Sequence, residues 1–292
     1  MRTKKIIWRG AVGKKVVALL DWLRGQGSVA VGFSGGVDST FLAAVAQLAL
    51  GKKALAVTID TPLLARSELR EARALAKQIG IRLHVERINV LTEQNIAGNP
   101  PDRCYYCKKI DFTRIFEVAR AEGITCICDG TNVDDQGDYR PGSKALAEVG
   151  SQSPLKLFGF TKADIRAASR QLGLPTAEKP AMACLASRFP YGSQITQRGL
   201  TTVERAELAL RGLGFKQLRV RLHGDVGRIE LAPAELGRAL KLREKIHTLL
   251  KAAGIRYVTL DLAGYRLGSL NEALGSVRQR TNLHRTFPDF WG

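Results

Sequence analysis

The order of apolar and polar positions changes along the chain and divides it into two parts. Up to about residue 175, short apolar runs alternate with longer segments in which apolar positions recur every three or four residues. The short runs are typical of buried strands, and the longer segments of amphipathic helices. Because strands that alternate with helices form parallel sheets covered on both faces, this part predicts an α/β fold with a parallel sheet sandwiched by helices.

The predicted elements of this part also indicate where a ligand would bind. In chain order we predict a helix at 11–25, a strand at 28–36 that ends in glycines, a helix at 37–51, a strand at 53–60, a helix at 65–80, a strand at 81–90, a helix at 111–123 and a strand at 124–130. In open parallel sheets, ligands bind beyond the carboxyl ends of the strands. The segments that follow the strands are therefore the first places to look for chemistry.

The alternation fades after a long connection rich in proline and glycine. Beyond it we predict a helix at 196–212, strands at 216–222 and 227–232, a helix at 233–253 and a strand at 255–262. This order predicts a smaller α+β domain. We place the boundary near residue 190, which gives domains at 1–190 and 191–292.

Charge narrows the class of partner. The chain has 45 Lys plus Arg against 27 Asp plus Glu, a net charge of +18. Such an excess favours a phosphate-bearing or otherwise anionic partner, but nucleotides, tRNA and acidic surfaces all fit it. A basic surface that is simply well solvated fits it as well.

The apolar content also bears on location. No apolar run is long enough to cross a membrane, and the first fifteen residues lack the apolar core of a secretory signal. Five cysteines at irregular spacing do not resemble a disulfide framework. We therefore expect a cytoplasmic protein with reduced thiols and no membrane partner.

The segment FSGGVDS at 33–39 follows the first strand and opens a helix. Backbone N–H groups and the helix dipole attract an anion at such a position, and Gly35 and Gly36 allow close approach of the backbone to phosphate oxygens. Ser34 and Ser39 can donate hydroxyl hydrogen bonds, and the Asp38 carboxylate could help to hold Mg²⁺. The Gly-Lys-Ser/Thr ending of a Walker A loop is missing. A turn in which these residues only cap a helix is the alternative.

A second polar segment, CDGTNVDDQGDYRPG at 128–142, follows the fourth strand at the same edge of the sheet. Its carboxylates repel one another unless cations or hydrogen-bond donors gather there. Adenosine contacts, Mg²⁺ binding, positioning of Arg140 and a solvated turn all remain open. The carboxylates are those of Asp129, Asp134, Asp135 and Asp138.

The five cysteines fall into three groups. Cys126 and Cys128 lie two apart in a predicted buried strand, which favours a structural role. Cys104 and Cys107 form a lone Cys-x-x-Cys that we place in a loop before a helix, and Cys184 lies in the long connection. Redox chemistry, zinc and structural cysteines remain open, and so does a [4Fe-4S] cluster held by three thiolates with one open iron position.

The string Ser-Gly-Gly-x-Asp-Ser resembles the signature of the PP-loop ATP pyrophosphatases. That resemblance implies an adenine nucleotide alpha hydrolase-like fold, with ATP that adenylates a carbonyl or carboxylate oxygen and releases pyrophosphate. A nucleophile then displaces AMP. The chemistry makes sense because AMP is a far better leaving group than the original oxygen.

Further motifs narrow the resemblance to the LarE family of PP-loop sulfur transferases. They are SGGVDST, RCYYCK, DGTNVDDQGDYRPG, SPL, CLASRFPYG and GYRLGSLNE, in matching order over nearly the whole chain. The resemblance implies adenylation of pyridinium-3,5-biscarboxylic acid mononucleotide and attack by a sulfide donor, in two rounds, for synthesis of the nickel-pincer cofactor. It also implies a homo-oligomer.

The family's functional residues map onto this sequence. The resemblance assigns the ATP phosphates to Ser34, Gly35, Gly36, Asp38 and Ser39, the cluster to Cys104, Cys107 and Cys184, and the substrate phosphate to Arg188, Arg219 and Arg221. We also predict that Asp129 and Asn132 belong to the cofactor-binding site. Glu207 and Glu230 could position substrate or Mg²⁺, or be ordinary surface residues. Some family members instead use one cysteine, at the position of Cys184, as a sacrificial sulfur donor.

Two other classes of function remain as alternatives. A [4Fe-4S]-dependent tRNA thiolase would suit the positive charge, although we find no appended RNA-binding module and expect no nucleic-acid partner. A non-catalytic nucleotide-binding protein or metallochaperone that retained the fold is the other. Substrate-dependent release of pyrophosphate would distinguish the non-catalytic protein from the sulfur transferase and the tRNA thiolase.

Overall fold

The computed structural model describes residue 8 and residues 10–135, 141–180 and 183–266. The chain forms two compact units, one of residues 1–96 and 102–184 and the other of residues 97–101 and 185–292. The predicted division at residue 190 stays a prediction. No local pattern in the sequence indicates that the short segment 97–101 groups with the C-terminal part.

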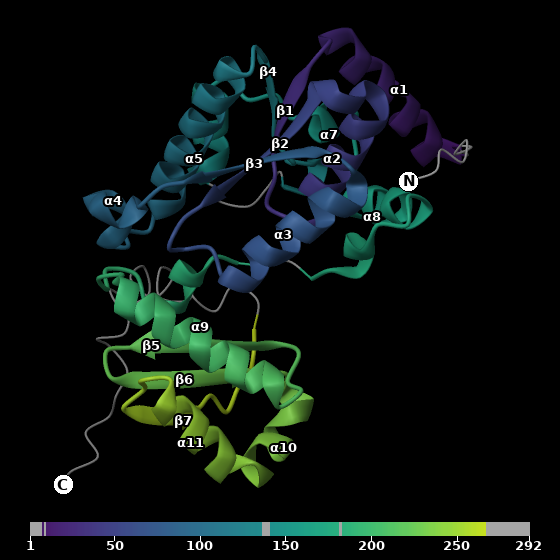
Figure 1. Cartoon of the computed structure of the whole chain (residues 1–292). Helices are drawn as coiled ribbons and strands as arrows, with labels where there is room; N and C mark the ends of the chain where they lie inside the picture. The colour runs from purple at the N-terminus through teal and green to yellow at the C-terminus, as the bar shows by residue number, and fades with distance from the viewer. Residues whose placement is uncertain (1–7, 9, 136–140, 181–182, 267–292) are drawn as a thin grey trace, which may run out of the picture. The chain divides into compact units, whose positions relative to one another are not determined.

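The first unit is an α/β unit around a parallel sheet, as predicted (Figure 1). The strands are β1 (Val29–Gly32), β2 (Ala54–Asp60), β3 (Arg82–Arg87) and β4 (Cys126–Cys128), and their order in the sheet is β3-β2-β1-β4. β1 pairs in parallel with both β2 and β4. The carboxyl ends of the two central strands and β4 therefore lie at the same edge of the sheet.

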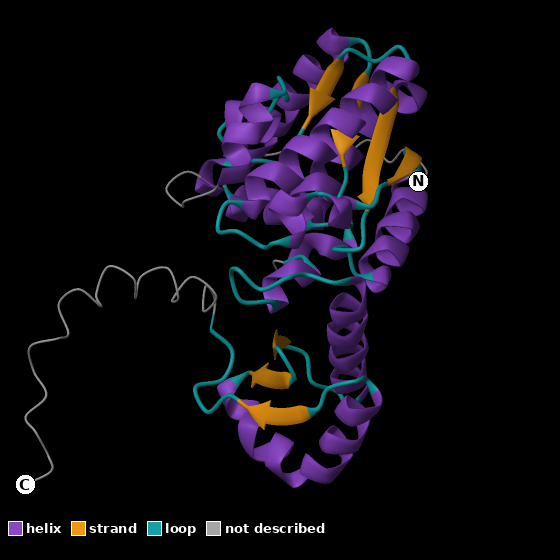
Figure 2. Ribbon diagram, turned by 90° about the vertical axis from the view of Figure 1, so that its left-hand side faces the viewer, coloured by secondary structure: helices purple, strands orange, loops and turns teal. Residues whose placement is uncertain are grey.

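Side chains of the central strands alternate between two apolar clusters, one on each face. On β1, Val29 and Val31 pack with α2 and the helices around it, whereas Ala30 packs with the α5 side. Cys126 and Cys128 are buried in the first of these clusters with their sulfur atoms 3.8 Å apart. Figure 2 shows helices on both faces of the sheet. The helices of this unit are α1 (Gly10–Gln26), α2 (Val37–Leu50), α3 (Arg66–Ile79), α4 (Gln94–Ala97), α5 (Arg103–Ala121), α6 (Pro141–Glu148), α7 (Pro154–Leu157) and α8 (Lys162–Gln171).

The predicted boundary that differs most from the structure in this unit is the start of the helix near the cysteine pair. Helix α5 begins at Arg103 and not near residue 111, so Cys104 and Cys107 lie in its first turns and not in a loop. The helix can begin there because Pro100 and Pro101 precede it and nothing after Asp102 breaks it. The two thiols, three residues apart, share one helix face.

The second unit consists of a three-stranded sheet and helices around its own apolar core. Its elements are α9 (Gln197–Gly212), β5 (Leu218–His223), β6 (Val226–Leu231), α10 (Leu236–Lys241), α11 (Arg243–Ala252) and β7 (Tyr257–Leu260). β6 pairs antiparallel with β5 and parallel with β7. The single helix predicted at 233–253 is instead two helices that meet at Leu242. No glycine or proline marks this break.

The structure also bears on membrane association. Within the residues that it describes, every helix is too short or too polar to cross a bilayer.

Candidate active site

The predicted phosphate loop joins β1 to α2. Its first residue continues the sheet, since the Phe33 N–H donates to the Val57 carbonyl at 2.8 Å. Gly35 has φ of +71°, a conformation that glycine adopts without a steric penalty. The Ser39 hydroxyl lies 3.1 Å from that of Ser34 and accepts from the Ser34 N–H at 3.2 Å. The structure thus brings Ser34, Gly35 and Ser39 together with Gly36 at the start of a buried helix.

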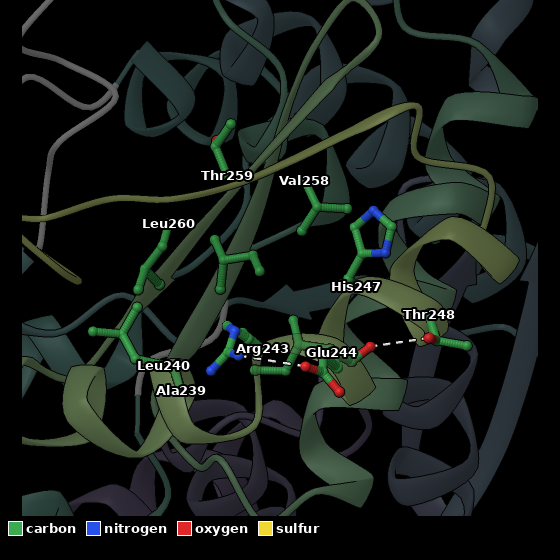
Figure 3. A pocket seen from close by; sticks show the side chains of 11 residues that line it. Ala239, Leu240, Arg243, Glu244, His247, Thr248, Val258, Thr259 and Leu260 are labelled. Carbon is green, nitrogen blue, oxygen red and sulfur yellow. Dashed lines mark hydrogen bonds and ion pairs between the residues drawn. The ribbon is translucent and has the colours of Figure 1, made fainter.

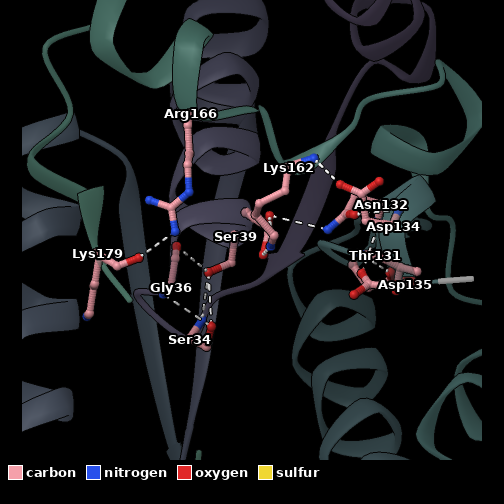
Figure 4. Close-up of polar contacts among 12 residues, drawn as sticks. Ser34, Gly36, Ser39, Thr131, Asn132, Asp134, Asp135, Lys162, Arg166 and Lys179 are labelled. Carbon is pink, nitrogen blue, oxygen red and sulfur yellow. Dashed lines mark hydrogen bonds and ion pairs between the residues drawn. The ribbon is translucent and has the colours of Figure 1, made fainter. Parts of the chain in front are cut away.

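Asp38 lies in the first turn of α2 and forms an ion pair that the sequence did not suggest. Lys162, the first residue of α8, donates through Nζ to Asp38 Oδ1 at 2.6 Å (Figure 4). Asn132 donates weakly to the same oxygen at 3.4 Å. Thr161 and Asp164 form a capping box that begins α8, and this places Lys162 beside the loop. The capping box was readable in the sequence, but the partner of Lys162 was not.

Hydrogen-bond donors offset the repulsion expected in the acidic segment. Asp129 is buried and accepts from the hydroxyls of Ser151 and Ser153 and from the Thr131 N–H. Asp134 accepts from the Lys162 N–H, and Asp135 from the Asn132 N–H, at 2.6 and 3.0 Å. Asp138 and Arg140 lie outside the described residues.

Glycine brings this segment against the phosphate loop. A β-carbon at Gly130 would lie 3.2 Å from the Ser39 nitrogen and 3.3 Å from the Asp38 Cβ. The segment after β4 therefore packs directly on the first turn of α2. Asp129 and Asn132 flank Gly130 in this segment, and their role in binding a nucleotide stays a prediction.

Three of the five cysteines of the first unit, Cys104, Cys107 and Cys184, lie near Arg103, a residue that the sequence patterns did not single out. Arg103 is buried and donates to Cys104 Sγ at 3.8 Å. Burial lowers its pKa, but the nearby Cys184, Cys104 and Cys107 raise the pKa more, so the net shift is upward. All three thiols are thus close enough for their charges to act on one guanidinium.

The same thiols do not form a ready metal site. Cys104 and Cys184 are exposed and Cys107 is half-buried. Burial raises the pKa of the Cys107 thiol, and the nearby Cys184 and Asp111 raise it further, which disfavours the thiolate that metals bind. Among the residues that the structure describes, no group of three Cys, His, Asp or Glu side chains could hold a metal ion. The thiol set is chemically suited to iron, but its described arrangement leaves the cluster unsupported by geometry.

Asp111, one turn beyond Cys107 on α5, provides a test of the electrostatics of this region. Burial raises its pKa from 3.8 to about 6, although Lys108 acts in the opposite direction. A carboxyl group whose pKa is raised by folding contributes stability at low pH and loses it as the pH rises through about 6. We expect Asp111→Asn to be more stable than the wild type at pH 8 by roughly 2 kcal/mol, and no more stable at pH 4.

Urea unfolding at the two pH values measures this difference. Asp21→Asn is the matched control, because that carboxylate is 64% exposed and pairs with Arg24 on the surface. Equal shifts for both variants at both pH values would show that Asp111 is not buried in this way.

The arginines expected to bind the substrate phosphate form a buried layer in the second unit. Arg188 makes two hydrogen bonds of 2.9 Å to Glu207, and Arg221 makes two of 3.0 Å to Glu230. The two glutamates are therefore not ordinary surface residues. Arg219 shares a strand face with Arg221 but lies over the Tyr265 ring at 5.3 Å.

Arg219 differs from the other two arginines in its charge balance. No carboxylate among the described residues lies within ion-pair distance of it, and its side chain is buried. Burial lowers its pKa, and the positive charge of Arg188 lowers it further. A bound anion would relieve both effects, so the layer as a whole is suited to a phosphate group.

The Arg188–Glu207 pair makes a second testable prediction. Its side chains are 2% and 7% exposed, so Arg188→Met leaves a buried carboxylate without its cation. We expect a loss of about 3–5 kcal/mol in the free energy of unfolding, and recovery of most of it in Arg188→Met with Glu207→Leu. The exposed pair of Arg24 and Asp21 is the control, since Arg24→Met should cost less than about 1 kcal/mol. A loss in Arg188→Met no larger than in this control would contradict the buried pair.

The second unit also contains a cavity of about 530 Å³ bounded by α10, α11 and β7 (Figure 3). Its walls are largely aliphatic, with Arg243 and Glu244 among the lining residues. None of the predicted site residues lines it. Cavity size alone therefore does not locate the chemistry.

Comparison with known proteins gives one family match and several relatives. The NAD synthase family profile matches residues 18–98, which include the phosphate loop. A pyridinium-3,5-bisthiocarboxylic acid mononucleotide synthase of Lactiplantibacillus plantarum is 39% identical over 91% of this chain and 95% of its own. An uncharacterised protein of Synechocystis is 43% identical over 84% and 92%. A tRNA-specific 2-thiouridylase of Acetivibrio thermocellus is 28% identical over 58% and 59%.

Proposed function

The chain belongs to the LarE family of pyridinium-3,5-bisthiocarboxylic acid mononucleotide synthases, and on that premise we propose that it catalyses ATP-dependent sulfur insertion into pyridinium-3,5-biscarboxylic acid mononucleotide. The observation that carries the proposal is the phosphate loop of Ser34, Gly35, Gly36 and Ser39 at the start of α2. The bisthiocarboxylic acid mononucleotide synthase of Lactiplantibacillus plantarum, which matches this chain over nearly its whole length, supports the choice of substrate. The product would serve nickel-pincer cofactor synthesis.

The first half-reaction is adenylation. A substrate carboxylate oxygen attacks the α-phosphorus of ATP, the bond to the bridging oxygen breaks, and pyrophosphate leaves with the electron pair. The phosphate loop would hold the β- and γ-phosphates by its N–H groups and hydroxyls, which are fixed before the substrate binds. Lys162 and Mg²⁺ would neutralise charge beside Asp38, and Asp129 and Asn132 would fix the segment that contacts the nucleotide.

The second half-reaction replaces AMP by sulfur. A sulfide donor attacks the acyl carbon, a tetrahedral intermediate collapses, and AMP leaves. One oxygen has then been exchanged for sulfur, and a second round treats the other carboxylate. The substrate phosphate would bind Arg219, with Arg188 and Arg221 held in place by their glutamates; the buried positive charge of Arg219 supports this assignment.

For the sulfur route, we propose that Cys104, Cys107 and Cys184 hold a [4Fe-4S] cluster that would supply a transferable sulfide when bound. The chemistry of the ligand set supports this proposal, because thiolates are the usual ligands of iron–sulfur clusters. The exposure of Cys184 favours a second candidate, in which Cys184 gives up its own sulfur. The two routes predict different masses for the protein after turnover.

Release of pyrophosphate that requires both Mg²⁺ and the mononucleotide tests the proposal. A gel-shift with bulk tRNA tests the tRNA thiolase alternative, towards which the 2-thiouridylase similarity points. We expect saturable binding of the mononucleotide and no retained tRNA band. Tight tRNA binding without mononucleotide binding would contradict the proposed substrate. We also propose a homo-oligomer and a cytoplasmic location.

A further inference from the structure

Lys179 reaches the phosphate loop from outside the motif. It follows the short helical turn Pro175–Glu178, and its side chain is only 13% exposed. Its Nζ donates to the carbonyl oxygen of Gly35 at 3.0 Å and lies 2.9 Å from Glu71 Oε2. Lys179 is therefore not a solvated surface charge, because its ammonium group contacts both the phosphate-loop backbone and the Glu71 carboxylate of α3.

The backbone that carries Lys179 is itself held. Arg166 donates to the carbonyl of Ala177, and to that of Lys179 at 2.9 Å, and Figure 4 shows its guanidinium reaching toward Lys179 above the loop. Pro180 restricts the residue before it to extended conformations, and Lys179 has φ of −63° and ψ of 128°. The direction of the lysine side chain is therefore set independently of the phosphate loop.

The contact matters because of the peptide that it holds. In a planar trans peptide the carbonyl and the following N–H point in opposite directions. With the Gly35 carbonyl directed to Lys179, the Gly36 N–H points the other way, where it donates to the Ser34 hydroxyl at 3.3 Å. Flanking glycines have no β-carbon to resist rotation of this peptide. Rotation would turn a carbonyl oxygen toward a bound anion.

We propose that Lys179 is a positioning residue for ATP: it fixes the Gly35–Gly36 peptide so that the Gly36 N–H, and not the Gly35 carbonyl, faces the phosphates. This inference rests on the proposed function, in which the loop binds the pyrophosphate moiety of ATP. Glu71 keeps the lysine in place. The effect should be confined to ligands that fill the phosphate loop, because AMP lacks the two phosphates bound there.

Binding of α,β-methylene ATP and of AMP to the full chain, measured by calorimetry with Mg²⁺, tests the inference. For Lys179→Met we expect about tenfold weaker binding of the triphosphate and no change for AMP, and Lys179→Arg should stay within about threefold of the wild type for both. The exposed Lys77→Met, on α3, is the control for loss of a positive charge.

Each outcome decides the inference. Equally weakened binding of both nucleotides to Lys179→Met would mean that Lys179 has a merely structural role. Unchanged binding of both would mean that its contact with the Gly35 carbonyl does not affect ATP binding. Either result overturns the inference. A wild type without any preference for the triphosphate over AMP would overturn it as well. If the wild type prefers the triphosphate and Lys179→Met loses that preference, but no sulfur enters the mononucleotide, the proposed function fails while this inference stands.

Discussion

We expect Cys184→Ala to lose sulfur transfer, by at least about 1,000-fold, and still to release pyrophosphate from ATP in the presence of the mononucleotide. Both proposed sulfur routes require this thiol, whereas the phosphate loop does not contain it. Liquid chromatography of the nucleotide products and a coupled pyrophosphate assay on the same sample give the two rates. Pyrophosphate release should stay within about threefold of the wild type, because adenylation uses separate groups.

The control for this variant is Cys126→Ala, which removes a buried thiol from the same unit. It should keep sulfur transfer. Cys104→Ala with Cys107→Ala then separates the routes: loss of iron and of sulfur transfer supports the cluster, and full retention of transfer supports the sacrificial cysteine. Retention of sulfur transfer in Cys184→Ala would exclude both routes.

Lys162→Met lowers the rate of pyrophosphate release by about 100-fold, the second large effect that we expect. The variant leaves the Asp38 carboxylate without the cation that lies 2.6 Å away, beside the loop that must accept the phosphates of ATP. The unpaired Asp38 carboxylate would repel the phosphates of ATP, and this repulsion disfavours both ATP binding and the transition state. Steady-state kinetics of pyrophosphate release measure the change.

Two further variants at nearby lysines make this result interpretable. Lys162→Arg should recover a large part of the rate, because the guanidinium still pairs with Asp38. Lys156→Met removes an exposed lysine of α7 and should have no effect. Unchanged kinetics in Lys162→Met would mean that Asp38 does not need this partner.

The strand, loop and helix around the phosphate motif could be predicted because the information is local. An apolar strand, two glycines and an apolar helix follow one another within about twenty residues, and their order alone places an anion site. The same reasoning put Cys126 and Cys128 on one buried strand face, which the structure confirms. Here neighbours in sequence are also neighbours in space.

Elements whose limits depend on distant packing were predicted less well. The start of α5 lies about eight residues before the predicted start, because the Cys-x-x-Cys segment suits a loop before a helix as well as the first turns of the helix itself. The break at Leu242 has no local signal. Lys162 and Lys179 escaped notice for a related reason: they lie 124 and 144 residues from their partners on the phosphate loop.

The arginine layer shows what a pattern of charges leaves open. The alternation of side chains along a strand correctly predicts that Arg219 and Arg221 share one face. It could not show that Arg221 pairs with Glu230 while Arg219 lies over the Tyr265 ring. That distinction changes the expectation for a bound phosphate, because only a guanidinium with unmatched charge attracts an anion strongly. Which arginine has a carboxylate partner depends on how neighbouring strands align, and the sequence of one strand does not reveal that alignment.

The most direct measurement is the mass of the mononucleotide after anaerobic incubation of the wild-type chain with ATP, Mg²⁺ and a sulfide donor, together with the AMP formed. Our account predicts that the mononucleotide exchanges oxygen for sulfur, with one AMP released for each exchange. AMP and pyrophosphate formed without sulfur in the mononucleotide, or sulfur found in tRNA instead, would contradict it.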